Sequence, residues 1–441
     1  MASEPAPSDY RSYVLLVLAV LWLAGTYLAF LGLGQVQAVP DLLQLSMFIA
    51  LTIAALIVGY LLEAHRRPKA EPRSAGPRTE SIRRVTFWSG LYVAVYALAM
   101  LDEYGATSAS SVIEAVFNPG AAYFSKFDIY AQQAGRDANL LIQILTLLAV
   151  LYVPLVPFTI VYWQRLTLAI KILAVLAQVL YVSFFFYIGT SKGLGDILIF
   201  TAVGLLVVQH RQRDLLRRKI IRRRVQVFGI VMACLFVAYM SFSQSQRIST
   251  AGVEGRFAPN PVVQSLTGEK FARGLSVTAS YPTHGYLGLA YNLGTPFEWT
   301  GGRGGSRALD SYLAQYGVAD SVESITYPAR TEQRTGWPAR MFWATAYPWL
   351  ASDLTFPGVI IFMGVLGWWL SRLWRETVVG MSQLSLLLLC ELSLFIAFIP
   401  ANNQIGTSRP SLIGFLVLVG AYAFNRSHRR SREGGRLATY P

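Results

Sequence analysis

The stretch 281–310 gathers the side chains of this chain that are best suited to chemistry. It reads YPTHGYLGLAYNLGTPFEWTGGRGGSRALD and holds His284, Glu298, Arg303 and Arg307 among seven glycines. Glycines let backbone N–H groups come close to a ligand, and tyrosine and tryptophan rings stack on it. Histidine and carboxylates serve as general bases, whereas arginines bind phosphate and carboxylate groups. The stretch is therefore the candidate functional site.

A short helix is predicted at the end of this stretch. Ser306 is a preferred N-cap residue, and apolar residues recur at helical spacing from Leu309 to Tyr316 before Gly317 ends the pattern. The two arginines then lie around the helix N-terminus, where free N–H groups and the helix dipole favour an anion. A phosphate or carboxylate pocket and a simple structural turn both fit this pattern.

The rest of the chain indicates a polytopic membrane protein. Of 441 residues, 54% are hydrophobic and 14% charged, and apolar runs long enough to cross a bilayer recur along the chain. We expect an all-α fold with about ten spans and one large, partly helical external loop. The expected spans are 13–34, 42–62, 85–101, 139–162, 166–188, 195–209, 225–243, 355–371, 376–399 and 411–424.

The spans divide the chain into four parts. Residues 1–243 hold the first seven spans and basic inside loops, and residues 244–354 form the large external loop. Residues 355–425 hold the last three spans, and residues 426–441 form a basic tail. Within the other external loop, 102–139, the capping-box spacing of Ser111 and Glu114 predicts a short surface helix that ends at Asn118.

The net charge of +14 is explained by topology. Clusters of Lys and Arg at 66–84, 211–224, 372–375 and 426–436 all fall on one side when the N-terminus starts inside. The positive-inside rule therefore predicts that both termini are cytoplasmic, in a bacterial inner membrane, with contacts to anionic lipid and not to nucleic acid. Cys234 and Cys390 lie in expected spans, and no residues have metal-ligand spacing, so we expect neither a disulfide framework, a metal nor a cofactor.

Further candidates lie at the ends of the expected spans. Lys192 follows a Gly-Thr-Ser turn, and Asp196 lies one helical turn further on, where it can pair with the lysine. Lys192 is either a ligand for a lipid-linked phosphate or a lysine that snorkels to the membrane surface. Asp353 stands at the entry to the eighth span, where it caps the helix or serves the site. The last external turn carries amides suited to sugar hydroxyls. Other external candidates are Arg256, Arg273, Tyr286, Asn403 and Arg409.

These residues carry a resemblance to a known family. Thr283-His-Gly-Tyr-Leu-Gly-Leu-Ala, Pro296-Phe-Glu-Trp-Thr and Gly302-Arg-Gly-Gly-Ser-Arg resemble the large periplasmic loop of O-antigen polymerases, the Wzy-type repeat-unit polymerases. The Gly-Thr-Ser-Lys turn is similar to a Gly-Ser-Arg turn of that family, with lysine in place of arginine. Asp353 with Phe356-Pro-Gly358 resembles its Asp-Phe-Gly element, with an insertion. The resemblance covers about 170 residues, 187–358.

The resemblance implies a GT-C-like glycosyltransferase that joins sugar repeat units on undecaprenyl diphosphate at the periplasmic face. Donor and acceptor are lipid-linked glycans, and a chain-length regulator is a further expected partner. For the general base we rank His284 first, Glu298 second and Asp353 third. For binding substrate and diphosphate we expect Lys192, Arg256, Arg273, Tyr286, Arg303, Arg307, Asn403 and Arg409.

Three other functions compete with polymerisation. An O-antigen ligase would use the same donor but pass the glycan to the lipid A core, and another lipid-linked glycosyltransferase would need the same kinds of group. A flippase or other transporter would show internal repeats and charged or broken helices at mid-membrane. No repeat is evident in the sequence, and the ionisable residues inside expected spans are few, with Lys171 and Glu391 the clearest. The long external loop favours an enzyme.

Overall fold

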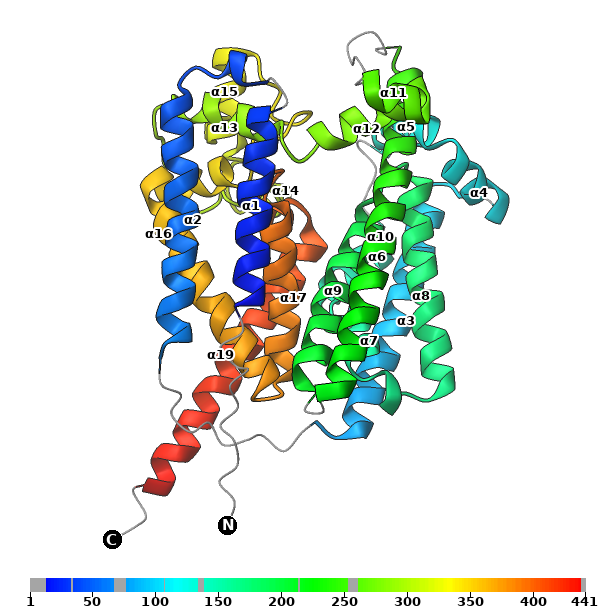
Figure 1. Cartoon of the computed structure of the whole chain (residues 1–441), viewed down its shortest axis with the longest axis vertical. Coiled ribbons are helices and arrows are strands. Elements are labelled where there is room, and N and C mark those ends of the chain that lie inside the picture. Colours follow the sequence, from blue (N-terminus) through cyan, green and yellow to red (C-terminus); the bar gives the residue numbers. More distant parts are fainter. Residues whose placement is uncertain are drawn as a thin grey trace.

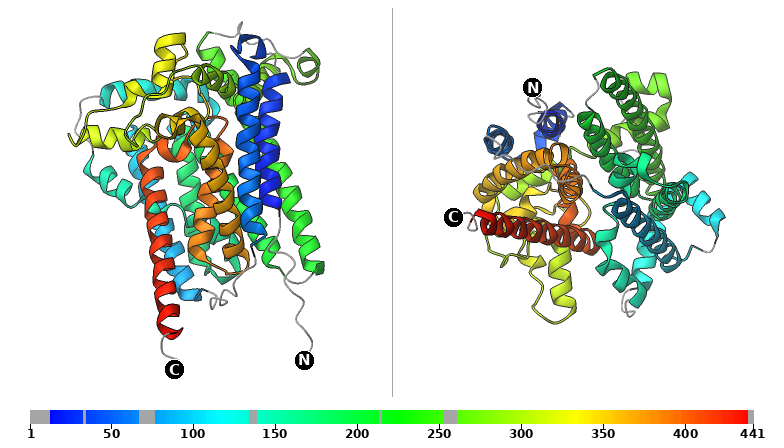
Figure 2. Two further views of the ribbon diagram at one scale, coloured as in Figure 1. Left: turned by 90° about the vertical axis from the view of Figure 1, so that its left-hand side faces the viewer. Right: turned by 90° about the horizontal axis from the view of Figure 1, so that it is seen from below.

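The protein is described by a computed structural model that covers residues 13–32, 35–66, 77–106, 108–133, 139–212, 215–252 and 261–437. Every element in these ranges is a helix, as the composition predicts. The helices form two halves that lie side by side (Figure 1; Figure 2, right).

The α16 half is built from both ends of the chain. It contains α1 (Val14–Gly32), η1 (Gln35–Ala38), α2 (Leu42–Ala64), α13 (Gly285–Leu293), α14 (Arg307–Gln315), η5 (Glu323–Ile325), α15 (Tyr327–Thr335), α16 (Tyr347–Val378), α17 (Gln383–Phe398), α18 (Gln404–Thr407) and α19 (Arg409–Leu437).

The α10 half is built from the middle of the chain. It contains α3 (Thr79–Glu103), α4 (Ala109–Phe117), α5 (Pro119–Gln133), α6 (Leu140–Leu147), η2 (Ala149–Leu151), α7 (Leu155–Val161), η3 (Trp163–Arg165), α8 (Leu168–Tyr187), α9 (Lys192–Arg211), α10 (Leu215–Thr250), α11 (Pro261–Thr267) and α12 (Glu269–Ser280).

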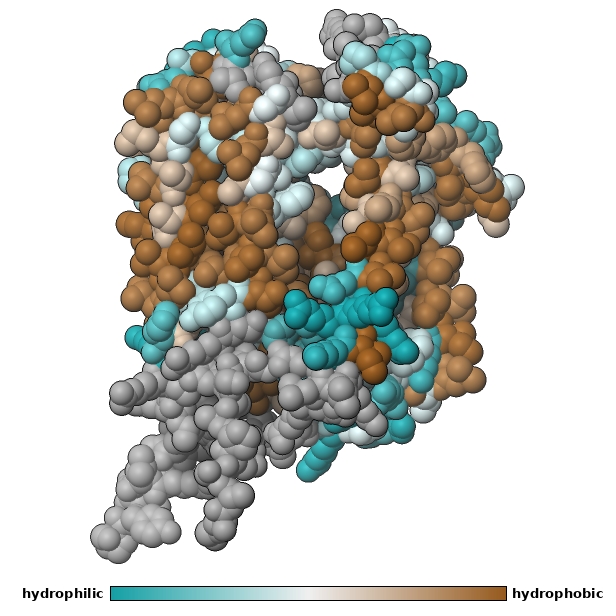
Figure 3. All heavy atoms as spheres, viewed as in Figure 1, coloured by the Kyte–Doolittle hydropathy of each residue, from teal (hydrophilic) through white to brown (hydrophobic). Residues whose placement is uncertain are grey.

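Within the described ranges, seven helices are long and apolar enough to cross a membrane: α1, α2, α3, α8, α9, the part of α10 from Lys219 onward, and α16. Hydrophobic residues cover the middle of both halves and hydrophilic residues gather toward the ends, as a bilayer requires (Figure 3). The expected span 139–162 is instead a pair of helical segments that meet at 59°. The two segments meet at Leu148, whereas Pro154 and Pro157 lie further along, within the second segment. The expected spans 376–399 and 411–424 correspond to the short α17 and to part of α19, so the count of ten stays a prediction.

The closest helix packing in the α16 half joins α2 to α16. A Cβ atom on Gly59 would lie 1.8 Å from the carbonyl oxygen of Gly364, and one on Gly367 would lie 2.1 Å from that of Leu56. Only glycine therefore permits this approach of two backbones, which is how helices commonly associate in membranes. The contact fixes α16, the helix that carries Asp353 and Trp349.

The elements that position the site all lie at one end of the molecule, here named the loop end. α4, α5 and α11–α15 lie there, while the last turn of α19 lies at the opposite end (Figure 1). Two boundaries differ from the sequence prediction. α4 is capped by Ser108 rather than Ser111, because the Ser108 hydroxyl accepts the Ser111 N–H at 3.3 Å. After Asn118 the chain does not stay irregular, because Pro119 begins α5.

Candidate functional site

The glycine-rich loop before α14 is organised by one carboxylate. Asp353 accepts hydrogen bonds from the Thr300 hydroxyl at 2.5 Å, the Gly305 N–H at 2.7 Å and the Gly304 N–H at 3.3 Å. The helix break at Thr355, which has φ 66°, lies two residues after Asp353. α16 begins at Tyr347 and not at residue 355, so Asp353 lies inside a short helical segment and faces the loop. These contacts give Asp353 a positioning role.

The helix predicted after the loop is confirmed. The Ser306 hydroxyl accepts the Leu309 N–H at 3.2 Å and begins α14, and Gly317 adopts φ +65° just beyond its end. The same hydroxyl donates to the Gly406 carbonyl at 3.0 Å. The N-terminus of α14 is therefore held against α18, close to the point where α19 begins.

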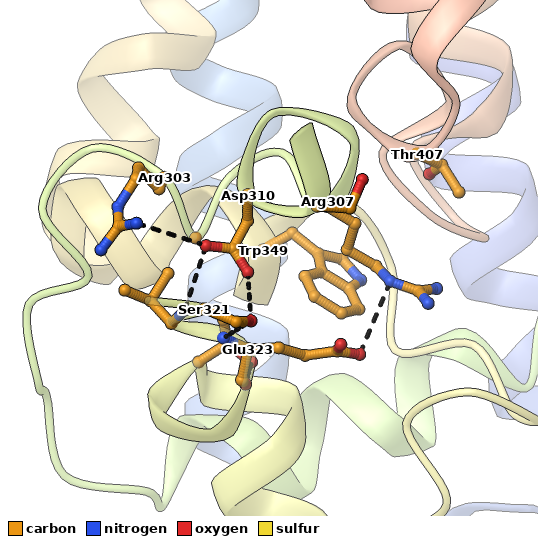
Figure 4. A pocket seen from close by; sticks show the side chains of 11 residues that line it. Arg303, Arg307, Asp310, Ser321, Glu323, Trp349 and Thr407 are labelled. Carbon is orange, nitrogen blue, oxygen red and sulfur yellow. Dashed lines mark hydrogen bonds and ion pairs between the residues drawn. The ribbon is translucent and has the colours of Figure 1, made fainter. Parts of the chain in front are cut away.

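A pocket of about 190 Å³ lies beside the N-terminus of α14 (Figure 4). It is lined by side chains from α14, the turn before η5, α16 and α18, namely Arg303, Arg307, Asp310, Ser311, Ser321, Glu323, Thr326, Trp349 and Thr407. Cations, hydroxyls and one large aromatic ring thus share a small space. Cations and N–H groups can bind an anion, and an aromatic ring can pack on an apolar ligand face, so the composition is suited to a ligand that carries both.

Both pocket arginines are only loosely paired with carboxylates. Arg303 Nη1 lies 3.7 Å from Asp310 Oδ1, and Arg307 Nε lies 3.8 Å from Glu323 Oε1. The Arg307 guanidinium also stands 5.8 Å from the Trp349 ring centroid. These separations exceed ordinary hydrogen-bond lengths, although Arg303 Nη1 also donates to the Asp320 carbonyl at 2.9 Å. An anion of higher charge can therefore compete with the carboxylates for the guanidinium groups.

The two pocket carboxylates differ in their surroundings. Asp310 is buried and accepts the Ser321 hydroxyl at 2.6 Å and the Val322 N–H at 3.0 Å. Glu323 is more open and accepts two hydrogen bonds from Arg340, at 3.0 and 2.7 Å. Those hydrogen bonds and the charge of Glu323 raise the pKa of Arg340. Asp310 therefore serves the loop structure, whereas Glu323 faces the pocket.

Asn403 and Arg409 both contact the site from the last external turn. Asn403 is buried and donates to the Gly305 carbonyl at 2.6 Å, while its own oxygen accepts the Gly406 N–H at 3.1 Å. Arg409 lies over the Tyr312 ring of α14, 4.3 Å from its centroid. Asn403 is thus occupied by backbone contacts, and Arg409 borders the pocket at the α14 surface.

His284 lies in a separate aromatic cluster. Its ring stacks on Trp343 at 5.3 Å between centroids, and Tyr281 and Phe342 pack around it. Nε2 accepts the Trp343 N–H at 3.3 Å, so Nδ1 carries the proton and donates to the Ser280 carbonyl at 3.2 Å. Burial lowers the pKa of His284. Both nitrogens of this neutral ring are engaged by backbone groups, which favours a structural role.

The other predicted residues are spread over both halves. Glu298 is half exposed and pairs with Arg330 at 3.4 Å, away from the pocket lining. Tyr286 is buried against α1, where its hydroxyl lies 2.9 Å from that of Thr26. Arg273 pairs with Glu269 on α12. Lys192 binds Asp196 at 2.6 Å, which confirms the predicted pair, on α9 of the α10 half. Arg256 lies outside the described residues.

Of the residues that line the pocket, sequence analysis singled out only Arg303 and Arg307, and it missed Trp349 and Glu323 among others. Trp349 follows Pro348, and proline is common in the first turn of a helix, so Tyr347 could have been taken as a helix start. Trp349 and Asp353 are then four residues apart on one helical face, which was the available signal. No sequence pattern marks Glu323, because it reaches the pocket from a 3-10 turn. Among the described residues, no group of three or more His, Cys, Asp or Glu side chains is arranged to hold a metal.

Comparison of the chain with protein-family models, with curated proteins and with solved structures finds no match. The candidate site is therefore assigned from its own geometry and chemistry.

Proposed function

We propose that this protein polymerises oligosaccharide repeat units carried on undecaprenyl diphosphate, at the periplasmic face of a bacterial inner membrane. The observation that carries the proposal is the pocket beside α14, where Arg303 and Arg307 share a small space with Trp349 and several hydroxyl groups. The pocket is at the loop end of a helical, membrane-type fold, where a lipid-anchored substrate would present its sugar. The resemblance of the glycine-rich loop to O-antigen polymerases supports the same reaction.

In the proposed reaction, a hydroxyl of the acceptor glycan attacks the anomeric carbon of the donor sugar. A new glycosidic bond forms, the bond from that carbon to the diphosphate oxygen breaks, and the electron pair leaves with the lipid diphosphate. Arg303 and Arg307 stabilise the negative charge that grows on this leaving group. The hydroxyl proton passes to a carboxylate, and we assign this role to Glu323, the more exposed of the two carboxylates that line the pocket.

Glu323 replaces the three bases expected from the sequence within this proposal. His284 uses both ring nitrogens for backbone contacts, and Asp353 accepts three hydrogen bonds from the glycine-rich loop. Glu298 faces Arg330 outside the pocket lining. These three residues keep supporting roles for the loop end.

A transporter of lipid-linked glycans is the second candidate, and three observations favour it. The α6–α7 pair is bent by 59° and α16 is broken at Thr355, and broken helices are typical of transporters. Asp196 and Glu391 are buried ionisable residues inside apolar helices. Figure 3 also shows an opening between the two halves in the upper part of the molecule.

The test is extension of a lipid-linked repeat unit by purified protein in detergent. We compare wild type, Arg303→Ala and Arg307→Ala with Arg84→Ala, which removes an exposed arginine that pairs with Glu80. The proposal expects laddered products from wild type and Arg84→Ala, and loss of the ladder in both pocket variants. Folded wild type that makes no ladder from authentic substrate, yet moves it across liposome membranes, would establish the transporter.

A further inference from the structure

A second cationic site lies in the α10 half, apart from the pocket beside α14. Lys126 of α5 places Nζ 3.7 Å from the centroid of the Tyr123 ring, and the Arg247 guanidinium of α10 lies 4.1 Å from the same centroid. The two cationic centres are therefore within about 8 Å of each other. Like charges this close repel, so an anion bound beside both would be stabilised.

Neither cation is paired with a carboxylate of the described residues. Among the described residues, no carboxylate lies within salt-bridge distance of Lys126 or Arg247. Burial and the charge of Arg247 lower the pKa of Lys126 to about 8. The Arg247 Nε is buried and has no hydrogen-bond partner, which leaves a charged donor unsatisfied. An anionic group would supply the missing acceptor and relieve the repulsion.

The backbone holds the two cations rigidly. Arg247 donates to the Gly189 carbonyl, and Gly189 has φ +63° in the turn that leads to Lys192. A Cβ atom at Gly189 would lie 2.3 Å from the Tyr123 nitrogen, so only glycine lets α5 approach this turn. Arg247 is also a hydrogen-bond partner of Tyr281, which packs on Trp343 at 4.1 Å. The site is therefore connected to the aromatic cluster around His284.

The surroundings indicate that the anion is attached to a lipid. Phe124 and Phe127 flank Lys126 on α5 and are exposed, and Ile113 and Phe117 of the neighbouring α4 are exposed as well. α4 and α5 project sideways at the loop end, next to the ends of α8 and α10 (Figure 1). Exposed apolar side chains beside cations are typical of segments that lie in a membrane interface.

We propose that Lys126 and Arg247 bind the phosphate group of a lipid at the membrane interface of the loop end. A lipid diphosphate and a phospholipid head group share this chemistry. The proposal depends on the proposed polymerase function only for the identity of the lipid. Binding itself requires no glycosyl transfer.

The experiment measures binding of farnesyl diphosphate, inorganic pyrophosphate and phosphatidylglycerol nanodiscs to full-length protein in detergent. Lys126→Ala is the main variant, because Lys126 makes only ring contacts within the described part of the chain and its removal relieves repulsion. Lys171→Ala is the matched control, since Lys171 also stands over an aromatic ring, 4.9 Å from the Trp163 centroid, at the end of α8 opposite the loop end.

The expected result is that farnesyl diphosphate binds wild type and Lys171→Ala equally, and Lys126→Ala about tenfold more weakly. Arg247→Gln should weaken binding further. Equal affinity of all the variants would overturn the site, and equal binding of pyrophosphate and farnesyl diphosphate would overturn the lipid attachment. Displacement by phosphatidylglycerol would identify the occupant as a bilayer phospholipid. If farnesyl diphosphate binding depends on Lys126 but the protein makes no polymer, the polymerase proposal is rejected and the phosphate site stands. If the protein makes normal polymer but binding does not depend on Lys126, only the phosphate site is rejected.

Discussion

The carboxylate of Asp353 accepts the Gly305 N–H at 2.7 Å, which fastens the first segment of α16 to the glycine-rich loop. The backbone of the loop, and with it the start of α14, is positioned from the helix that also carries Trp349. The geometry of the pocket therefore depends on a residue that does not line it.

Asp353→Asn should loosen this loop. The amide keeps one oxygen acceptor but turns an NH₂ group toward a backbone N–H, so at least one charge-assisted hydrogen bond is lost. We expect a loss of about 1–3 kcal/mol in the free energy of unfolding, toward the lower end because Asp353 is half-buried. Thermal melting in detergent measures it, with Asp320→Asn, an exposed aspartate near the pocket, as control. A melting temperature no lower than that of the control would argue against the positioning role.

Arg307→Ala should reduce turnover with little effect on folding. Its pairing with Glu323 is long, at 3.8 Å, so little stability is lost, but a donor to the leaving diphosphate disappears. Removal of one such preorganised donor typically lowers kcat by about 10²-fold. Arg307→Lys should fall between wild type and alanine, because lysine keeps the charge without the planar fork. Steady-state elongation assays check this, and a kcat equal to that of Arg84→Ala would remove Arg307 from the mechanism.

His284 should contribute a pH dependence of stability rather than of chemistry. Burial lowers the pKa of His284 in the folded protein below the value of about 6.5 that it has in the unfolded chain. At pH values between the two pKa values, the unfolded chain therefore binds more protons than the folded protein. Stability is therefore complete above about pH 6.5 and falls as the pH drops below it. Melting temperatures from pH 7.5 to 5 should decline in wild type, and His284→Ala should melt lower throughout with a shallower decline.

The control for this experiment is His65→Ala, which changes an exposed histidine at the end of α2. It should keep the wild-type slope. Elongation by His284→Ala, per mole of folded protein, should stay close to wild type. If His284→Ala were folded but did not elongate glycans, His284 would be the general base.

The sequence predicts most of the fold because the bilayer imposes long apolar helices. The expected span 42–62 agrees with α2 within two residues at its end. The break in 139–162 is at Leu148, within an uninterrupted apolar run, and hydropathy does not describe it. Ser306 and Gly317 predicted α14 because caps are local signals. Helix caps and long apolar runs can therefore be predicted from the sequence, because they depend only on neighbouring residues.

The composition of the site depends on contacts that local signals do not contain. His284 was the most conspicuous titratable group of the loop, yet its nitrogens are used by Trp343 and Ser280, one of them 59 residues away. Glu323 and Arg247 carry no motif and become notable only through their neighbours. Arg303 and Arg307 could be placed from sequence because both lie next to a predicted helix start.

Lys126 should give phosphate binding a distinct pH profile. With its pKa at about 8, the free lysine loses its charge as the pH rises from 7 to 9, so affinity for farnesyl diphosphate should fall across this range. The other groups facing it do not cause this change: Arg247 keeps its charge because arginine does not lose its proton in proteins, and burial raises the pKa of Tyr281. Lys126→Arg should flatten the profile. If the pH dependence of binding were unchanged in Lys126→Arg, a group other than Lys126 would cause it. Lys171→Arg serves as control.

Glu391 provides the test that separates an enzyme from a transporter. It is buried in α17 and interacts electrostatically with Asp196 and Lys192 of α9, so it lies where the two halves meet. In a polymerase the reacting groups are in the pocket beside α14, and Glu391→Gln should elongate glycans at the wild-type rate. In a transporter the halves must change their contacts, and neutralising this carboxylate should stop lipid-linked glycan from crossing proteoliposomes. Glu114→Gln, which changes a carboxylate on the exposed α4, is the control. Elongation at the wild-type rate by Glu391→Gln supports the polymerase. If neither wild type nor Glu391→Gln elongates glycans, and only Glu391→Gln fails to translocate them, the protein is a transporter.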